Sequence, residues 1–243
     1  MRKIAIANRK GGVGKTTSAV NIAHGLSLAG YKVLLIDTDT QAHCSRILGV
    51  KPQYGLPELI DGTCTPSEAL IEARERLFLL GGSKKLEGVI NDISRRDFRV
   101  EYVLTDSLKP YDGKYDYVVL DTAPGFNRLG INVLFYADEV LIPVSMEALA
   151  IDGLVAFMEE VENIRSHSNI EIRYIIPTFY DRRVKKSEEI LEQLKGHFGK
   201  KIIHLVNYSV KLSESPGWGK TIYEYASRDR TAKDYARLAG AIA

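Results

Sequence analysis

The chain has 243 residues, of which 45% are apolar and 26% are charged, and its 33 lysines and arginines nearly balance its 31 aspartates and glutamates. This composition suits one large or two small globular domains, and the absence of a Pro/Gly/Ser-rich linker and of internal repeats favours one domain, residues 1–243. The formal net charge of +2 excludes a strong global field, so any nucleic-acid or membrane surface must be local. Cys44 and Cys64 form no zinc, iron–sulfur or disulfide pattern, and no signal peptide or membrane span is recognisable, which favours a cytoplasmic protein.

The first predicted strand, residues 3–7, is followed by the glycine-rich run NRKGGVGKTT and then by a predicted helix over residues 15–30. A strand, a glycine-rich loop and a helix are the context of a phosphate-binding P-loop, in which backbone N–H groups and a helix N-terminus surround phosphate oxygens. In that motif Lys15 reaches the β- and γ-phosphates and the Thr16 hydroxyl binds Mg²⁺. The P-loop pattern G-x-x-x-x-G-K-[ST] is incomplete here, because Arg9 replaces the first glycine and Lys10 is an added cation.

Six more apolar runs follow, and helical patterns, notably residues 151–164 and 187–198, separate some of them. The predicted strands cover residues 32–37, 76–80, 115–121, 139–144, 172–177 and 201–206. Continuous Val, Ile and Leu runs are typical of strands buried on both faces of a parallel sheet. The fold class predicted is therefore α/β, a doubly wound and mostly parallel sheet with helices on both faces, whose ligands bind at the carboxyl ends of the strands.

Carboxylates follow two of these strands. LLIDTDTQ places Asp37 at a strand end and Asp39 just beyond it, and in YVVLDTAPG four apolar residues are followed by Asp121. An aspartate after a buried strand in a P-loop protein is the Walker B arrangement, which supports Mg²⁺. Either sequence alone would fit a solvated turn.

The run from Lys10 to Thr16 matches K-G-G-x-G-K-[ST], and on this motif the chain resembles the ParA/MinD family of deviant Walker A ATPases, closest to the ParA/Soj-type partition ATPases. The family's D-x-D-x-Q segment also matches from Asp37 to Gln41, with Thr40 in place of the usual proline. The resemblance implies the ligands ATP and Mg²⁺ and an ATP-dependent homodimer. In that dimer Lys10 would touch the phosphates of the nucleotide held by the other subunit.

The resemblance further assigns roles to individual residues. Asp39 would position or activate the attacking water, so that the catalytic set is Lys10, Lys15 and Asp39. The metal set would be Thr16, Asp37 and Asp121. The nucleotide-binding set would be Lys10, Gly11, Gly12, Val13, Gly14, Lys15, Thr16, Thr17, Glu147, Pro177 and Val210. A plain glutamate at a helix start is an equal alternative for Glu147.

Partition proteins, division-site proteins and metabolic enzymes share this nucleotide chemistry, so the motif alone does not choose among them. The last residues, RDRTAKDYARLAGAIA, do not form a basic amphipathic membrane helix, and no cysteine follows the later strands. A ParA-type ATPase that binds double-stranded DNA without sequence preference is therefore preferred. The DNA-binding residues would be Arg182, Arg183, Lys185, Lys186 and Lys211, although any one of these cations also fits a solvated helix face.

The resemblance also implies a ParB-like adaptor that stimulates hydrolysis, a nucleoid-associated location and no membrane partner. Two alternatives stay open: a MinD-like spatial regulator acting on a membrane or protein scaffold, and a metabolic or metallocluster-assembly ATPase. The cargo, whether plasmid, chromosome or protein organelle, is not encoded in any motif, and no role is assigned to residues 82–115.

Overall fold

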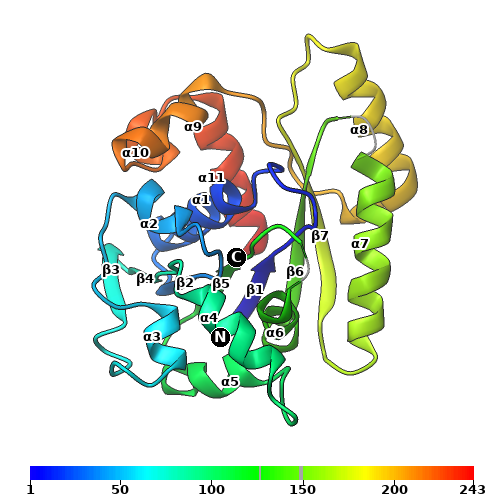
Figure 1. The fold of residues 1–243 in the computed structure, drawn as a ribbon. Helices are drawn as coiled ribbons and strands as arrows, with labels where there is room; N and C mark the ends of the chain where they lie inside the picture. Colours follow the sequence, from blue (N-terminus) through cyan, green and yellow to red (C-terminus); the bar gives the residue numbers. More distant parts are fainter. Residues whose placement is uncertain (126, 148–149) are drawn as a thin grey trace.

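The computed structural model describes residues 1–125, 127–147 and 150–243, and one seven-stranded sheet runs through it. Figure 1 shows the strands in the spatial order β3-β4-β2-β5-β1-β6-β7. Their bounds are β1 Arg2–Ile6, β2 Val33–Asp37, β3 Leu70–Arg74, β4 Leu77–Leu80, β5 Tyr117–Asp121, β6 Glu139–Ser145 and β7 Glu171–Thr178. All neighbouring strands pair in parallel except β3 and β4, which are antiparallel.

The central strands consist of the predicted apolar runs. Every residue of β2 and β5 is buried, because helices cover both faces of the sheet at these strands. The register aligns Asp37 of β2 with Asp121 of β5, so the two carboxylates end adjacent strands at the same level. This pairing, which depends on the parallel register, brings together two residues that lie 84 positions apart.

The sequence-based prediction of strands was wrong at the two margins of the sheet. Residues 201–206 do not form a strand, and they contribute only the isolated bridge between Ile175 and Ile202 before a loop. The antiparallel edge strand β3 was not predicted, because its sequence LIEAR has a single apolar pair and mostly part-exposed positions. Pairing with β4 through the tight turn at Arg76, whose φ is 61°, stabilises it instead.

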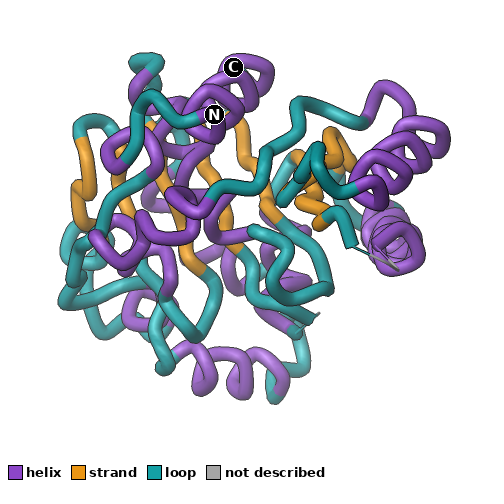
Figure 2. Tube along the Cα trace, turned by 90° about the horizontal axis from the view of Figure 1, so that it is seen from above, coloured by secondary structure: helices purple, strands orange, loops and turns teal. Residues whose placement is uncertain are grey.

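Helices form a layer on each face of the sheet, as the view from above in Figure 2 shows. One layer includes α1 (Lys15–Leu28), α2 (His43–Leu48), α9 (Val210–Glu214), α10 (Ile222–Tyr225) and α11 (Arg230–Ile242), with the 3₁₀ turn η3 (Ser215–Trp218). The other includes α3 (Leu56–Ile60), α4 (Leu86–Ser94), α5 (Val103–Leu108), α6 (Arg128–Tyr136), α7 (Ala150–Arg165) and α8 (Lys185–Phe198), with the 3₁₀ turns η1 (Lys109–Tyr111) and η2 (Gly199–Lys201). The predicted doubly wound α/β fold is confirmed.

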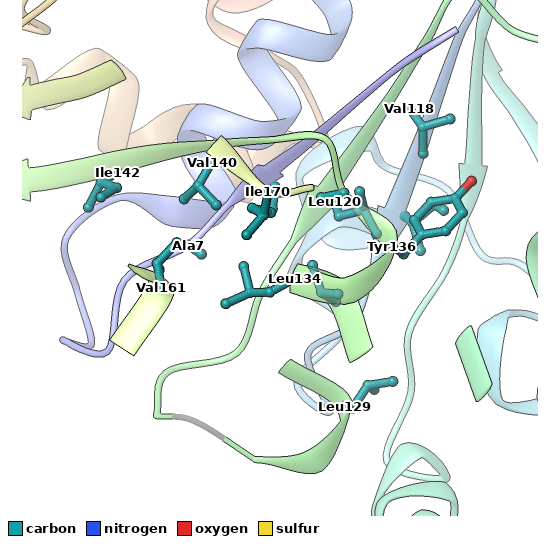
Figure 3. Packing of buried hydrophobic residues seen from close by; sticks show 14 of the residues in the cluster. Ala7, Val118, Leu120, Leu129, Leu134, Tyr136, Val140, Ile142, Val161 and Ile170 are labelled. Atoms are coloured by element: carbon teal, nitrogen blue, oxygen red, sulfur yellow. The ribbon is translucent and has the colours of Figure 1, made fainter. Parts of the chain in front are cut away.

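Each layer has its own apolar core. Figure 3 shows part of the core beneath α6 and α7, where Leu134 and Val161 pack toward strand residues such as Leu120 and Val140. On the opposite face α1 packs closely against α11. A Cβ on Gly25 of α1 would lie 2.8 Å from the Cβ of Ala239, so a glycine is needed at this crossing.

The final helix also fixes the two chain ends near one another. The Arg2 guanidinium donates to the carbonyl oxygen of Ile242, and it forms an ion pair with Glu139 at 3.0 Å. In the described part of the chain, no helix has the length and apolar character needed to cross a membrane. The glycine-rich loop follows β1 at the carboxyl-terminal edge of the sheet, which is where ligands bind in folds of this class.

Candidate active site

A cavity of about 640 Å³ opens at the carboxyl ends of β1, β2 and β5. The residues of the glycine-rich loop and of the segments after β2 and β5 form most of its wall. Its predicted lining residues are Gly11, Gly12, Gly14, Lys15, Thr16, Thr17 and Asp39. The parallel topology thus gathers the first three sequence motifs around one space, and the volume lies in the range of small-molecule sites.

Hydrogen bonds to the two neighbouring strands β6 and β7 hold the loop in place. Asn8 donates from its side chain to the Pro143 carbonyl at 2.8 Å and accepts from the Lys10 N–H at 3.0 Å. The Thr178 hydroxyl donates to the Val13 carbonyl at 2.9 Å. Gly12 and Gly14 have φ values of 73° and 88°, a conformation that favours glycine. The wall of N–H groups is therefore preorganised for an anion.

The two lysines of the loop have opposite environments. Lys15 is buried and donates from Nζ to the Lys10 carbonyl at 2.9 Å, and burial lowers its pKa, although Asp121 and Asp39 raise it in part. The Lys10 side chain is 40% exposed and forms an ion pair with Glu147 at 2.8 Å. Lys10 is not among the described residues that line the cavity. Hydrogen bonding from Lys10 lowers the Glu147 pKa. Lys15 belongs to the chain's own cavity, whereas Lys10 is directed away from it.

Asp37 and Asp39 are held by the first turn after β2. Asp37 Oδ1 accepts from the Asp39 N–H, and Asp37 Oδ2 accepts from the Cys44 N–H, both at 3.0 Å. Asp39 Oδ1 accepts from the Gln41 N–H at 3.0 Å. Asp37 is fully buried, while Asp39 reaches the cavity wall. The D-x-D spacing thus separates a buried carboxylate from one that can meet a ligand.

Asp121 forms a buried acidic pair with Asp37. No described residue hydrogen-bonds to its Oδ1 atom, although that atom is buried. Burial raises the Asp37 pKa to about 6, and the nearby Asp39 carboxylate raises it further. Burial also raises the Asp121 pKa, and the Asp37 and Asp39 carboxylates raise it further. Two buried carboxylates with a spare oxygen are a donor set that fits Mg²⁺. The Thr16 hydroxyl lies near enough to lower the Asp121 pKa in part, so it completes this set.

Several cavity residues were not among the predicted site residues. They are His43, Arg46 and Ile47 of α2, Phe179 after β7 and Pro216 of η3. Phe179 adopts a φ of 55°, and its ring would lie 3.5 Å from a Cβ placed on Gly14, so it packs on the phosphate loop. For Phe179 this left-handed conformation of a non-glycine residue at a cavity wall is a sign of a functional position, but it is visible only in the structure and not in the sequence.

Gly82 is a further residue that sequence reasoning missed. It follows β4, and a Cβ there would lie 2.6 Å from the Asp39 carbonyl oxygen and 2.9 Å from the Asp37 carbonyl oxygen. The backbone after β4 therefore supports the backbone that carries the two aspartates. The glycine pair Gly81 and Gly82 at a strand end was a visible but unspecific sign of such an approach.

Other predicted residues lie outside the cavity wall in the described structure. Pro177 is buried within β7, and its carbonyl accepts from the Val206 N–H, while Val210 is 55% exposed at the start of α9. The segments that contain them reach the cavity instead through Phe179 and Pro216. Of the segment predicted after β6, residues 148 and 149 lie outside the described residues.

The five predicted DNA-binding cations are exposed and fall into two groups. Arg182, Arg183, Lys185 and Lys186 lie between β7 and the first turn of α8, whereas Lys211 lies on α9. Arg183 pairs with Asp181 at 2.7 Å and thereby lowers the Asp181 pKa to about 2. Figure 1 shows α8 and α9 toward the same edge of the molecule but well apart. One chain therefore does not join them into a single patch.

Comparison with known proteins decides the family. A family model described as an AAA domain matches residues 1–174. The chain is 35% identical to the chromosome-partitioning ATPase Soj of Thermus thermophilus, covering 98% of this chain and 94% of the relative. It is 34% identical to the chromosome partitioning protein ParA of Caulobacter vibrioides, covering 98% and 92%. The chain belongs to the ParA/Soj family of P-loop ATPases.

Solved structures agree with this assignment. The apo McdA structure from Cyanothece superposes with a TM-score of 0.88 at 25% identity and full coverage of both chains. A cobyrinic acid a,c-diamide synthase from Mycobacterium smegmatis with a bound ATP analogue and magnesium gives a TM-score of 0.82 at 28% identity, covering 100% of this chain and 94% of that chain. Proteins of this fold thus include chromosome-partitioning proteins and a cobyrinic acid a,c-diamide synthase, so the fold alone does not fix the function.

Proposed function

We propose that this ParA/Soj-family protein is a Mg²⁺-dependent ATPase that dimerises on ATP, binds double-stranded DNA without sequence preference, and releases the DNA after hydrolysis. A ParB-like adaptor would stimulate the hydrolysis step, so that cargo is partitioned or positioned over the nucleoid in the cytoplasm. The family membership supports the partition role, and the environment of the loop lysines supports the dimerisation step.

The observation that carries the proposal is the direction of Lys10. Its ammonium group lies at the edge of the glycine-rich loop, 2.8 Å from the exposed Glu147 carboxylate, rather than in the chain's own cavity. An exposed ion pair of this kind is worth at most about 1 kcal/mol, so Lys10 can exchange it for a phosphate. Because the Lys10 ammonium group lies outside its own subunit's cavity, it can bind the phosphates of a nucleotide that a second subunit holds.

Within one subunit the remaining groups hold and activate the nucleotide. The N–H groups of the loop would surround the phosphates, and Lys15 would exchange the Lys10 carbonyl for a phosphate oxygen. Thr16, Asp37 and Asp121 would hold Mg²⁺ directly or through water, and the ion would neutralise phosphate charge. Asp39 stands at the cavity wall with one oxygen tied to the Gln41 N–H, so its other oxygen can orient the attacking water.

Dimerisation would create the DNA surface. The cations before α8 and Lys211 on α9 lie apart in one chain, toward the edge that carries the loop and the cavity. A second subunit docked at that edge would double each group and extend the positive surface. Contacts from Arg and Lys to phosphates are sequence-independent and weaken as salt rises. This links DNA binding to the ATP state without any base-reading residue.

Fluorescence anisotropy tests the proposal. A random-sequence duplex is titrated with the protein in ATP–Mg²⁺ and in ADP–Mg²⁺ at two salt concentrations. We expect binding in ATP only, and a loss of affinity of at least tenfold between 50 and 200 mM salt, in the range given by several phosphate contacts. Absence of binding in both nucleotide states would contradict the DNA role and favour a membrane or protein surface.

Charge variants assign the surface. Replacing Lys186 by alanine should weaken DNA binding and reduce the salt slope by about 1, because each phosphate contact contributes about 0.9. The matched control is Lys114→Ala, an exposed lysine just before β5 and therefore at the opposite edge of the sheet. Equal effects of the two variants would show that the affinity reflects net charge rather than this surface.

A further inference from the structure

Cys44 is buried beside the two strand-end carboxylates Asp37 and Asp121 rather than among apolar side chains alone. It follows the turn that carries Asp37 and Asp39, and it is fully buried in α2. Its Sγ atom is 3.6 Å from Asp121 Oδ2, and its N–H donates to Asp37 Oδ2 at 3.0 Å. One ligand atom from each of Asp37, Cys44 and Asp121 lies within 4.8 Å of the others. A thiol therefore joins the two carboxylates that fit Mg²⁺.

The geometry of this cluster suits a thiophilic cation. A tetrahedral Zn²⁺ with a Zn–S distance of about 2.3 Å and a Zn–O distance of about 2.0 Å sets its sulfur and oxygen ligands about 3.5 Å apart. The observed separation of Cys44 Sγ and Asp121 Oδ2 is 3.6 Å. Asp121 Oδ1 has no hydrogen-bond partner among the described residues, so this carboxylate still has an oxygen to offer.

We infer that Asp37, Cys44 and Asp121 form a binding site for a thiophilic divalent cation of the Zn²⁺ class, and that its occupation blocks the use of the same carboxylates by Mg²⁺. Mg²⁺ prefers oxygen ligands, whereas a thiolate selects Zn²⁺ and its chemical relatives. On binding, the sulfur–metal bond replaces the S–H bond and the thiol proton passes to solvent. Asp39 and Thr122, close along the chain to Asp37 and Asp121, line the cavity, which is the side from which a cation would enter.

The expected consequence of metal binding is inhibition of ATP hydrolysis, and this part of the inference rests on the proposed function. The binding step is independent of that function, because it needs neither ATP nor DNA. The alternative for Cys44 is a small buried side chain whose S–H donates weakly to Asp121. A probe that reports sulfur–metal bonding separates the two.

Cobalt(II) is that probe, because its thiolate complexes show a sulfur-to-metal charge-transfer absorption in the near ultraviolet. The full-length, reduced and nucleotide-free protein is titrated with Co²⁺ alone. We expect the band to saturate at one equivalent, to vanish in Cys44→Ser, and to persist in Cys64→Ser, the matched control at the one other cysteine. Circular dichroism verifies that each variant is folded. If Cys44→Ser does not fold, Cys44→Ala replaces it.

Inhibition gives the second readout. Zn²⁺ added to the Mg²⁺-supported ATPase reaction should inhibit wild type and Cys64→Ser alike, while the Cys44 variant should need at least tenfold more Zn²⁺ for half inhibition. Absence of the cobalt band in wild type, or its survival in the Cys44 variant, overturns the site. A cobalt band without ATPase activity under any condition would contradict the proposed function and leave the metal site supported.

Discussion

Single residues of the glycine-rich loop are distinguished by whether their side chains are buried. Lys15 is buried and anchored on the loop's own backbone, so its loss should remove nucleotide binding. Lys10 is part-exposed and anchored only on the exposed Glu147. The sequence places both lysines in one motif, but only the structure shows that they face different spaces.

Lys10→Ala should therefore retain ATP binding and lose ATP-dependent dimerisation. The chain's own cavity keeps Lys15 and the glycine N–H groups, so the nucleotide affinity should change less than about threefold. Light scattering measures the mass in ATP and in ADP, and equilibrium binding of a fluorescent ATP analogue measures the affinity. Dimers that form in ATP as readily as in wild type would exclude a role for Lys10 across the interface. Arg9→Ala, which removes the neighbouring exposed cation paired with Glu160, is the matched control and should still dimerise.

Asp39→Ala should separate hydrolysis from assembly. Because Asp39 is the carboxylate of its turn that reaches the cavity wall, its removal should lower turnover by at least about 100-fold, the lower limit for general-base catalysis. The phosphate cradle is unchanged, so ATP-bound dimers should accumulate. Phosphate release and light scattering on the same samples measure both effects. Wild-type turnover in this variant would remove Asp39 from the catalytic set.

Sequence reasoning predicted site residues from contiguous motifs, and the structure places those residues near one another. The spacing of Lys15 and Thr16, and the strand-end position of Asp121, were enough to predict a shared site. Phe179 and Pro216 lie in the two segments that were predicted through Pro177 and Val210, but loop geometry rather than residue type decides which residue of each segment reaches the cavity. The environment of Lys10 was equally hidden, since its partner Glu147 is more than a hundred residues away.

Elements at the sheet margin were harder to predict than those at its centre. Central strands are buried on both faces, so their sequences are uniformly apolar and readable. At the margins, β3 is half-exposed although it forms a strand, and residues 201–206 are mostly apolar although they do not form a strand. Whether a marginal segment becomes a strand therefore depends on its pairing partner and not on its composition. The same reason explains why Gly82, a loop glycine after β4, gave no functional signal although it supports the segment after β2.

Gly82→Ala should disturb that support. The added Cβ would lie 2.6 Å from a backbone oxygen of Asp39, which cannot move aside as a flexible side chain would. We expect a loss of about 1–3 kcal/mol of unfolding free energy and an ATP turnover at least tenfold lower, because the turn that carries Asp39 must shift. Thermal unfolding and phosphate release measure the two effects.

Gly88→Ala is the control for that variant. Gly88 lies in α4 with open space around its Cα, so alanine should raise stability by about 0.5–1 kcal/mol through helix propensity and leave turnover unchanged. If Gly82→Ala behaved like Gly88→Ala, the close approach of the two backbones would not matter for the site.

At the scale of the whole molecule, the C-terminal elements are joined to the first helix by buried polar contacts. His24 of α1 shares a hydrogen bond of 2.7 Å with the Thr221 hydroxyl, and Asn21 accepts from the Ile222 N–H at 3.0 Å. The ring of Tyr223 lies edge-on to His24. These contacts bind the C-terminal elements to the helix that begins at the phosphate loop, and we expect the stability of the fold to depend on the charge state of His24.

The pH dependence of unfolding tests this connection. Burial lowers the His24 pKa from its ordinary value of 6.5, Glu224 raises it in part and Arg74 lowers it further. Below pH 6.5 the unfolded chain therefore binds the proton more readily than the folded one, and this group's contribution to stability is lost as pH falls toward the folded pKa. Urea unfolding at pH 7.5 and 5.5 should show a smaller stability loss in His24→Gln than in wild type. The buried pair Asp37 and Asp121 is common to both proteins, so its titration cancels in the comparison. The exposed His204→Gln should keep the wild-type loss, and an identical loss in His24→Gln would show that this histidine does not couple α1 to the C-terminal elements.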